Sequence, residues 1–428
     1  MQFTNQPAAR PAGIPGLNNG YLADEEAIVR ELVAAADPGD SARAKIRETA
    51  AQLVRAVRRN KGSEGGIDAF LQQYDLSSEE GVLLMCVAEA LLRIPDADTA
   101  DRLIADKITS ASWKDHIGVS DSLFVNASTW GLMLTGQLLS VDETSIRNPA
   151  QALAKLASRA GEPVVRTAMR QAMRIMGHQF VMGRDIQEAL TRSARKDNSA
   201  YRYSFDMLGE AALTAEDAER YFSAYSDAIT SIGGASGSSE DVFSAPSISV
   251  KLSALHPRYS WLQHDRVMSE LVPRVQELAR HAKASGIALT IDAEESDRLE
   301  ISLQVFEQVY RDAALRDYEG LGLAVQTYQR RARAVIEFLV RAASEVGRRI
   351  PVRLVKGAYW DTEIKRAQEE GLSSYPVFTR KAHTDVSYLA CARLALGAAG
   401  ELYPQFATHN AHTLASILHY AGSRQDYE

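Results

Sequence analysis

Two patterns of apolar and polar positions divide the chain. From Asp24 to about Gly183, apolar residues recur at helical spacing, and the segment 77–93 opens with serines and glutamates, as helix starts often do. Residues 1–20 contain three prolines and several glycines without such spacing. We therefore predict a flexible N-terminal arm over 1–20, and a helical arm and α-domain over 21–185.

After about residue 200 the pattern changes to short runs of β-branched and aromatic residues, each followed by helical spacing. Six runs are predicted to be strands: 203–207, 247–252, 287–292, 321–326, 352–356 and 405–410. Segments such as 266–284 and 328–346 are predicted to be the helices between them. Strands that alternate with helices indicate βαβ units around a parallel sheet. The Gly- and Ser-rich stretch 233–240 falls inside this repeat and is predicted to be a long loop.

Polar side chains gather at or just past the carboxyl ends of the predicted strands. They are Asp206, Lys251, Asp292, Gln326, Arg353, Lys356, His409 and Asn410. In a (β/α)8 barrel these ends meet at one mouth, where catalytic groups collect. A doubly wound sheet usually has a Gly-rich phosphate turn after its first strand, whereas the segment 203–212 has a single glycine. We therefore predict an α/β fold, a (β/α)8 TIM-type barrel preceded by an all-α N-terminal domain.

Composition and charge narrow the classes of function. The 428 residues are 46% hydrophobic and 24% charged, which suits a globular protein of two or three domains. A net charge of −7 argues against binding along a phosphate backbone, so no nucleic-acid partner is expected. Cys86 and Cys391 are the only cysteines, which excludes a disulfide framework. With no apolar run of about 20 residues and no signal-peptide pattern, we expect a cytoplasmic protein, and peripheral membrane contact stays open.

Several groups at the predicted mouth have residue types suited to chemistry. Lys251 and Asp292 follow consecutive strands and could form either a site for a small zwitterion or a structural ion pair. The segment 353–361 combines two cations, a glycine and two aromatics, and could hold a planar, polyanionic cofactor or merely cap a strand end. Residues 379–381 could meet a phosphate at a helix start. The two histidines in 409–412 lack further ligands at suitable spacing, so no metal site is predicted.

Seven segments, taken together and in order, carry a family resemblance. They are YSFDMLGEAALT (203–214), SVKLSALHPRY (249–259), TIDAEESDRLEISL (290–303), AVQTYQRRA (324–332), RLVKGAYWDTEIKRAQ (353–368), PVFTRKAHTDVSYLACA (376–392) and FATHNAHT (406–413). They closely resemble the proline dehydrogenase domain of proline utilization A, a family of bacterial bifunctional flavoenzymes. The helical region before them is similar to the arm and α-domain of that family. The resemblance implies that L-proline is oxidised to 1-pyrroline-5-carboxylate by hydride transfer to FAD, with electrons passed to a membrane quinone.

The resemblance also implies roles for individual residues. Lys251 and Asp292 match positions at the proline site, and Arg353 matches a position close to the flavin nitrogen that accepts the hydride. Asp206 and Glu210 match an acidic pair at the substrate entrance. The positions that match flavin contacts are Asp292, Gln326, Arg353, Lys356, Gly357, Ala358, Tyr359, Trp360, Thr379, Lys381, Thr408, His409 and Asn410.

Parts of the family's pattern are not found in this sequence. A closed barrel needs about eight strands, and six are predicted here. In the family, the last two βα units follow, with a pair of arginines that grip the proline carboxylate. An NAD-dependent domain that oxidises glutamate semialdehyde to glutamate comes later still. We therefore expect residues 186–428 to form an FAD-binding barrel that is C-terminally incomplete, and expect no proline turnover from this chain alone.

Other features of the family are left open by the sequence. Some members begin with a ribbon-helix-helix DNA-binding domain, for which residues 1–20 are too short and too rich in proline. The oligomeric state, a homo-oligomer included, is not determined by the sequence.

Two other hypotheses compete with the flavoenzyme. The first is a lysine-dependent aldolase-type barrel, in which Lys356 or Lys251 forms a Schiff base with a carbonyl substrate. Such a protein would be colourless and would be trapped by borohydride in the presence of substrate. The second is a helical partner-binding module joined to a barrel without catalytic activity. A flavoenzyme, in contrast, would be yellow and would be bleached by proline.

Overall fold

The structure is a computed structural model that describes residues 13–60, 181–196, 198, 200–208, 211–237 and 241–422. The chain divides into two compact units, one made of Met1–Val54 and Lys196–Glu428 and the other of Arg55–Arg195. In the second unit the structure describes α10 (Ile186–Ser193), whose N-cap Asp185 accepts a hydrogen bond from the backbone N of Glu188. The helix predicted over 77–93, and most of the predicted α-domain, lie outside the described residues.

The first unit is built on one parallel sheet of six strands, in the order β1-β2-β3-β4-β5-β6. The strands are β1 (Ser204–Asp206), β2 (Ser247–Val250), β3 (Ala288–Ile291), β4 (Leu321–Gln326), β5 (Ile350–Val355) and β6 (Leu402–Phe406). Every strand pairs with the next one along the chain, as in the register that sets Ile248 opposite Leu289. Sequential parallel pairing is the arrangement of a (β/α)8 barrel, so the predicted fold class is confirmed.

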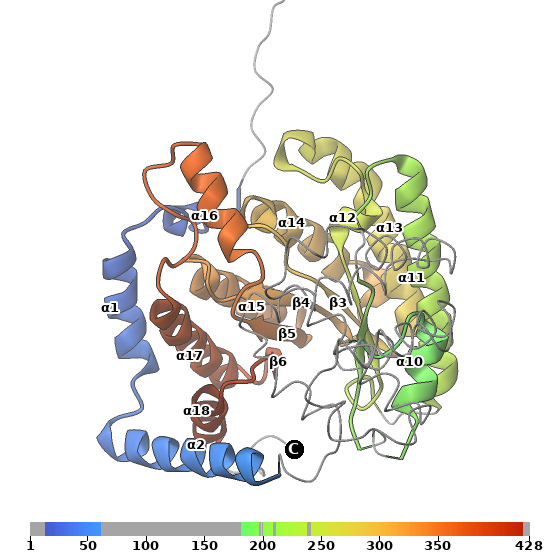
Figure 1. The fold of residues 1–428 in the computed structure, drawn as a ribbon. Coiled ribbons are helices and arrows are strands. Elements are labelled where there is room, and N and C mark those ends of the chain that lie inside the picture. The colour runs from blue at the N-terminus through green and yellow to red at the C-terminus, as the bar shows by residue number, and fades with distance from the viewer. Residues whose placement is uncertain are drawn as a thin grey trace, which may run out of the picture. The chain divides into compact units, whose positions relative to one another are not determined.

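A long helix follows each strand and packs against the sheet or a neighbouring helix (Figure 1). These helices are α11 (Ala215–Ser236), α13 (His264–Ala284), α14 (Leu299–Tyr310), α15 (Ala332–Val346), α17 (Lys381–Gly397) and α18 (Ala411–Ala421). Shorter elements occupy the connections: α12 (Leu252–Leu255), η3 (Trp261–Gln263), η4 (Ser296–Arg298), η5 (Ala313–Leu315) and α16 (Trp360–Glu369). Within the described part of the chain, no helix is long and apolar enough to cross a membrane.

The core lies between the sheet and these helices. All the residues of β4 are buried, and α15 contributes Val335, Ile336 and Leu339 from one face. Full burial of such side chains stabilises the fold by roughly 1.5–3 kcal/mol each.

The start of the chain differs from the prediction. Residues 13–20 belong to the segment predicted to be a flexible arm, yet Leu17 is only 1% exposed and η1 (Asn18–Gly20) is a regular turn. The backbone N of Ile14 donates to Glu300 Oε1 at 2.7 Å. The anchoring group thus belongs to α14, far away in the sequence, which is why a local pattern of prolines did not reveal it.

Two helices follow this segment and contact the barrel helices. Helix α1 (Glu25–Ala36) lies along α17, and its Leu32 shares an apolar cluster with Phe378. Helix α2 (Asp40–Asn60) follows, and its Ile46 and Ala50 cluster with Ala415 of α18. Helix α1 and the part of α2 up to Val54 therefore belong to the same compact unit as the sheet.

Two predicted boundaries are corrected by the structure. The stretch 233–240 is not entirely a loop, because α11 continues to Ser236 before Gly237 ends it at a φ of 65°. Gly233 is helical and lies so close to Ser285 that an added Cβ would come within 2.7 Å of the serine Cβ. The sixth strand is Leu402–Phe406, not 405–410, because Leu402 pairs with Ile350 and the polar residues after Phe406 lead into α18.

Candidate active site

Four charged side chains meet at the carboxyl ends of β1, β2, β3 and β5. Lys251 Nζ lies 3.5 Å from Asp206 Oδ1 and 3.4 Å from Asp292 Oδ2. Arg353 Nη1 lies 3.9 Å from Asp292 Oδ1. We call Asp206, Lys251, Asp292 and Arg353 the mouth quartet. The predicted convergence of these four residues is observed, although they come from four different strands and Asp206 and Arg353 lie more than a hundred positions apart in the sequence.

The guanidinium of Arg353 is held by three other strands. Its Nη1 donates to Ser249 Oγ of β2 at 2.8 Å, and its Nη2 donates to Ser204 Oγ of β1 at 2.6 Å. Its Nε donates to Gln405 Oε1 of β6 at 3.3 Å. A side chain of β5 can reach β1 only because the sheet curves, so Arg353 is fixed by the barrel geometry itself.

The pKa of Asp292, a member of the mouth quartet, is shifted by its surroundings. Burial and, after it, the nearby Asp206 carboxylate raise its pKa to about 6, against the lowering effects of Lys251 and Arg353. Its side chain is 17% exposed. A carboxyl group that titrates close to neutral pH between two cations is typical of functional sites, although structural ion pairs also show this feature.

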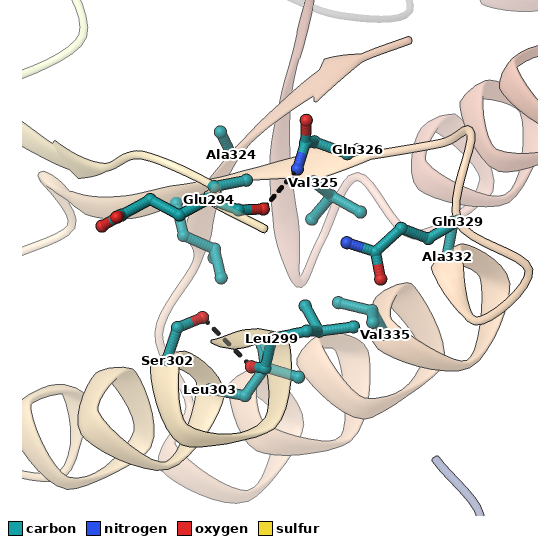
Figure 2. A pocket seen from close by; sticks show the side chains of 12 residues that line it. Glu294, Leu299, Ser302, Leu303, Ala324, Val325, Gln326, Gln329, Ala332 and Val335 are labelled. Atoms are coloured by element: carbon teal, nitrogen blue, oxygen red, sulfur yellow. Dashed lines mark hydrogen bonds between the residues drawn. The ribbon is translucent and has the colours of Figure 1, made fainter. Parts of the chain in front are cut away.

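Gln326, at the end of β4, joins the two loops on either side of it. Its Nε2 donates to the backbone O of Glu294 at 2.7 Å, as Figure 2 shows, and its Oε1 accepts from the backbone N of Ala358 at 2.9 Å. Glu294 in turn accepts from the backbone N of Ser253 at 3.0 Å. The loop that carries Asp292 and the segment that begins at Lys356 are therefore both hydrogen-bonded to the side-chain amide of Gln326.

A second link between the same two loops was not predicted. Glu363 of α16 is 2% exposed and accepts from both the backbone N and the Oγ of Ser296, at 2.6 and 2.5 Å. Burial raises the pKa of Glu363, while the Ser296 hydrogen bonds lower it. No local signal marks this residue, because its partner is 67 positions away in the sequence.

The two lysines predicted to bind a cofactor meet at one carboxylate. Lys356 Nζ and Lys381 Nζ donate to the two oxygens of Asp385, the second at 2.8 Å. Burial alone would raise the pKa of Asp385, but the hydrogen bonds from both lysines lower it. The sequence did not indicate Asp385, which lies in the first turns of α17 and has the composition of an ordinary helix surface.

The segment after β5 exposes an aromatic side chain beside a glycine. Trp360 is 42% exposed, and its Nε1 donates to the backbone O of Phe378 at 2.9 Å. Tyr359 directly precedes Trp360. Burial, and to a smaller extent the Glu294 carboxylate, raise the pKa of the Tyr359 phenol to about 12. Gly357 has a φ of 156°. The cations Arg353 and Lys356, the anchored indole of Trp360 and the exposed backbone of Gly357 form a set of groups suited to a planar, anionic cofactor.

Gly357→Ala tests how tightly this segment is packed. A Cβ at this position would come within 2.3 Å of the Tyr328 ring, so the variant must displace either the ring or the segment. We expect a loss of about 1–3 kcal/mol in the free energy of unfolding, measured by chemical denaturation. Gly397→Ala is the control, because an added Cβ there meets nothing within 4 Å. Equal stabilities of the two variants would contradict the close approach.

Of the remaining predicted site residues, the structure describes Thr379, Thr408, His409 and Asn410. Thr408 and Asn410 follow β6, where the Asn410 side chain caps α18 by accepting from Thr413 N at 3.0 Å. His409 between them is exposed. Thr379 donates both its backbone N and its hydroxyl to Glu25. Glu210 lies outside the described residues.

A small cavity lies behind the site, between the loop after β3, β4 and the helices α14 and α15 (Figure 2). Its volume is about 10 Å³, enough for at most one water molecule. It is therefore a packing void rather than a ligand site. Among the described residues, no group of three or more His, Cys, Asp or Glu side chains is arranged to hold a metal ion.

The parallel βα units, and the charged groups that meet at their carboxyl ends, define the chain as an α/β protein of the (β/α)8-barrel class with a polar mouth. The model of the proline dehydrogenase family matches residues 189–428, and the chain belongs to this family. The model described as the proline utilization A proline dehydrogenase N-terminal domain matches residues 17–58. A third, described as the DNA-binding domain of proline dehydrogenase, matches residues 66–180. This region lies outside the described residues, so the expected absence of a nucleic-acid partner stays a prediction.

Several known proteins are similar to the chain along nearly all its length. It is 48% identical to the bifunctional protein PutA of Salmonella typhimurium over 425 residues, 99% of this chain and 32% of that protein. The PutA of Rhizobium meliloti is 49% identical over 422 residues, 97% of this chain and 33% of that protein. A crystal structure of a proline utilization A mutant from Bradyrhizobium japonicum has 46% identity and a TM-score of 0.70, covering 96% of this chain and 40% of that one. The chain thus spans about a third of the length of these curated relatives.

Proposed function

We propose that this chain carries the proline-oxidising site of a flavoenzyme, which converts L-proline to 1-pyrroline-5-carboxylate with FAD. The observation that carries this proposal is the mouth quartet, two cations and two carboxylates joined in a row by contacts of 3.4 to 3.9 Å, in a chain of the proline dehydrogenase family. A zwitterionic amino acid presents both signs of charge, and the quartet offers both counter-charges.

Each member of the quartet has a role that its chemistry allows. The Lys251 ammonium attracts the substrate carboxylate, and the ionised Asp292 accepts a hydrogen bond from the ring nitrogen. Oxidation removes a hydride from the ring carbon beside this nitrogen and a proton from the nitrogen, so the amine must first be unprotonated. Asp206, which is 39% exposed, lies at the outer side, where with Glu210 it would line the substrate entrance.

The residues present fit FAD by the chemistry of their donor set. Bound FAD would supply the acceptor for the hydride. Arg353, Gln326 and the segment from Lys356 to Trp360 would hold its ring system and chain, and Arg353 would stabilise the negative charge that builds up there. Thr379, Lys381, Thr408, His409 and Asn410 would hold the adenosine and pyrophosphate end.

The proposal extends to the electron acceptor and to a second, coupled reaction. We propose that the electrons pass to a membrane quinone, so the protein would work in the cytoplasm at the inner face of the membrane. We also propose that the reaction is coupled to the NAD-dependent oxidation of glutamate semialdehyde to glutamate in the full-length protein. The support is that the relatives are bifunctional PutA proteins, of whose length this chain spans about a third.

The aldolase hypothesis is less well supported by the geometry. A Schiff base needs an unprotonated lysine, which enzymes obtain by placing the amine in apolar or cationic surroundings. Lys251 instead lies 3.5 and 3.4 Å from two carboxylates, which favour its charged, non-nucleophilic form.

A product assay tests the proposed function. The full-length protein is incubated with L-proline and a soluble quinone analogue, and the cyclic imine product is trapped as a coloured adduct with o-aminobenzaldehyde. We expect an adduct that requires both the enzyme and the quinone. If no imine forms while carbonyl substrates become linked to the protein on borohydride treatment, the aldolase hypothesis replaces the proposed function.

Asp206→Asn should move the pH dependence of this reaction. Asp206 raises the pKa of Asp292, so removing its charge should bring that pKa below the value of about 6 in the parent protein. Since the ionised Asp292 is the active form, the acidic limb of kcat/KM against pH should then shift to lower pH. The protonation of free proline is the same for both proteins and cancels in the comparison. An unmoved limb would mean that Asp292 does not control it.

A further inference from the structure

Glu25, in the first turn of α1, is bound by groups that lie more than 300 positions away in the sequence. Its oxygens accept from Thr379 N at 3.0 Å, from Thr379 Oγ1 at 3.0 Å and from His383 Nδ1 at 2.5 Å. Arg330 Nη2 donates to it at 2.9 Å. The Glu25 side chain is 13% exposed, whereas that of the neighbouring Glu26 is 83% exposed.

Arg330 makes this arrangement rigid. Its side chain is 2% exposed, and its Nη1 donates to Ala23 O at 2.6 Å and to Ser374 Oγ at 2.7 Å. One guanidinium thus fixes the start of α1 and the loop before Thr379 at once. Charge-assisted hydrogen bonds of this kind are roughly twice as strong as neutral ones.

The contacts of Glu25 restrict what Thr379 can offer to a ligand. A threonine has two donors, its backbone N–H and its hydroxyl O–H, and both point at Glu25. What remains on the hydroxyl oxygen is acceptor capacity. Thr379 can therefore accept from a hydroxyl or an amino group, whereas it has no donor left for a phosphate oxygen.

We infer that Glu25 is a positioning residue of the cofactor site, which holds Thr379 as an acceptor for a donor group at the adenosine end of the dinucleotide. This inference rests on the proposed binding of FAD. It extends the site from the barrel to α1, which sequence patterns assign to a separate helical arm. The donor on the ligand is either a ribose hydroxyl or the adenine amino group.

Flavin affinity tests the inference without measuring turnover. The full-length protein is freed of flavin and titrated with FAD and with FMN, which lacks the adenosine part, and binding is followed by flavin fluorescence. In Glu25→Gln the side chain keeps one acceptor oxygen in place of two and loses its charge, so the hydrogen bonds that hold Thr379 become fewer and weaker. We expect about a tenfold weaker affinity for FAD, the effect of one lost hydrogen bond to the ligand, and an unchanged affinity for FMN.

Glu26→Gln is the matched control, because it removes the same charge from the same helical turn at an exposed position. Thr379→Val should remove most of the effect of Glu25→Gln in the double variant, since the two act through one hydroxyl. An FAD analogue with hypoxanthine in place of adenine distinguishes the ribose hydroxyl from the adenine amino group, because hypoxanthine lacks that amino group. If the amino group is the partner of Thr379, the analogue already binds the parent protein weakly.

The outcomes separate the inference from the proposed function. A loss for FAD alone, absent in Glu26→Gln, supports the inference. Equal losses for FAD and FMN, or no loss at all, would overturn it while leaving the proposed function intact. A parent protein that binds neither flavin would overturn the proposed function and the inference with it.

Discussion

Asp292→Asn in the full-length protein is expected to slow proline oxidation on the order of 100-fold while leaving the fold at least as stable as before. The Asp292 carboxylate lies against both Lys251 and Arg353. Without this charge, Lys251 loses one of the two carboxylates that hold it, and small misplacements at a reacting centre cost about this much. The measurement is kcat/KM for L-proline together with thermal unfolding of the same preparations.

The expected stability follows from the sign of the pKa shift. The folded pKa of Asp292 is raised to about 6, so the folded protein binds this proton more tightly than the unfolded chain does. The free energy of unfolding therefore falls as pH rises from about 4 to about 6, and the penalty is complete above that range. Asp292→Asn has no carboxyl group to ionise and does not pay this penalty. The difference by which its free energy of unfolding exceeds that of the parent protein should therefore grow with pH across that window and then stay constant.

Asp297→Asn provides the control for this pair of effects. Asp297 lies in η4 on the same loop, is 50% exposed and pairs with Arg366 at 2.8 Å. It should change neither turnover nor the pH dependence of stability. Should Asp292→Asn unfold more easily than the parent protein at pH 7 and still oxidise proline at the parental rate, Asp292 would be a structural ion-pair residue only.

Arg353→Met is expected to lower both the turnover and the reduction potential of the bound flavin. A fixed cation stabilises negative charge that develops close to it, and removing one such group typically slows a reaction by about 100- to 1000-fold. For a two-electron couple, a tenfold loss in the stability of the reduced form corresponds to about 30 mV. We expect the midpoint potential to fall by at least about this amount, as measured by anaerobic spectroelectrochemistry.

Two variants separate the charge of Arg353 from its packing. Arg353→Lys keeps a cation but cannot bridge Ser204, Ser249 and Gln405 together, so the potential should recover more than the turnover. Arg341→Met removes an exposed arginine from α15 and should change neither. An unchanged potential in Arg353→Met would place the cation away from the flavin.

The sequence predicted the parallel sheet and the mouth quartet for a physical reason. Strand runs are short and apolar, so a polar residue at the end of a run stands out, and the ends of parallel strands share one edge. Lys251 and Asp292 stand out in this way from the residues alone, because each directly follows an apolar strand run. Gln326 was also predicted, but its two bridging hydrogen bonds were not.

The residues that the sequence did not reveal have partners from distant elements. Glu25 has the pattern of an acidic residue in the first turn of a helix, where charge is favourable and exposure is common. Glu363 and Asp385 likewise occur near the starts of helices. Only tertiary structure distinguishes a buried acceptor from a solvated carboxylate at such positions. The packed residues 13–20 escaped prediction because their anchor belongs to α14.

The visible spectrum of the full-length protein under anaerobic conditions tests the central claim most directly. We predict flavin absorption bands in the purified protein that are bleached by L-proline, and a bleaching rate that falls sharply in Asp292→Asn and Arg353→Met. A colourless protein that takes up no flavin, or a flavin that L-proline does not reduce, would contradict the claim that proline is oxidised by FAD at the mouth quartet.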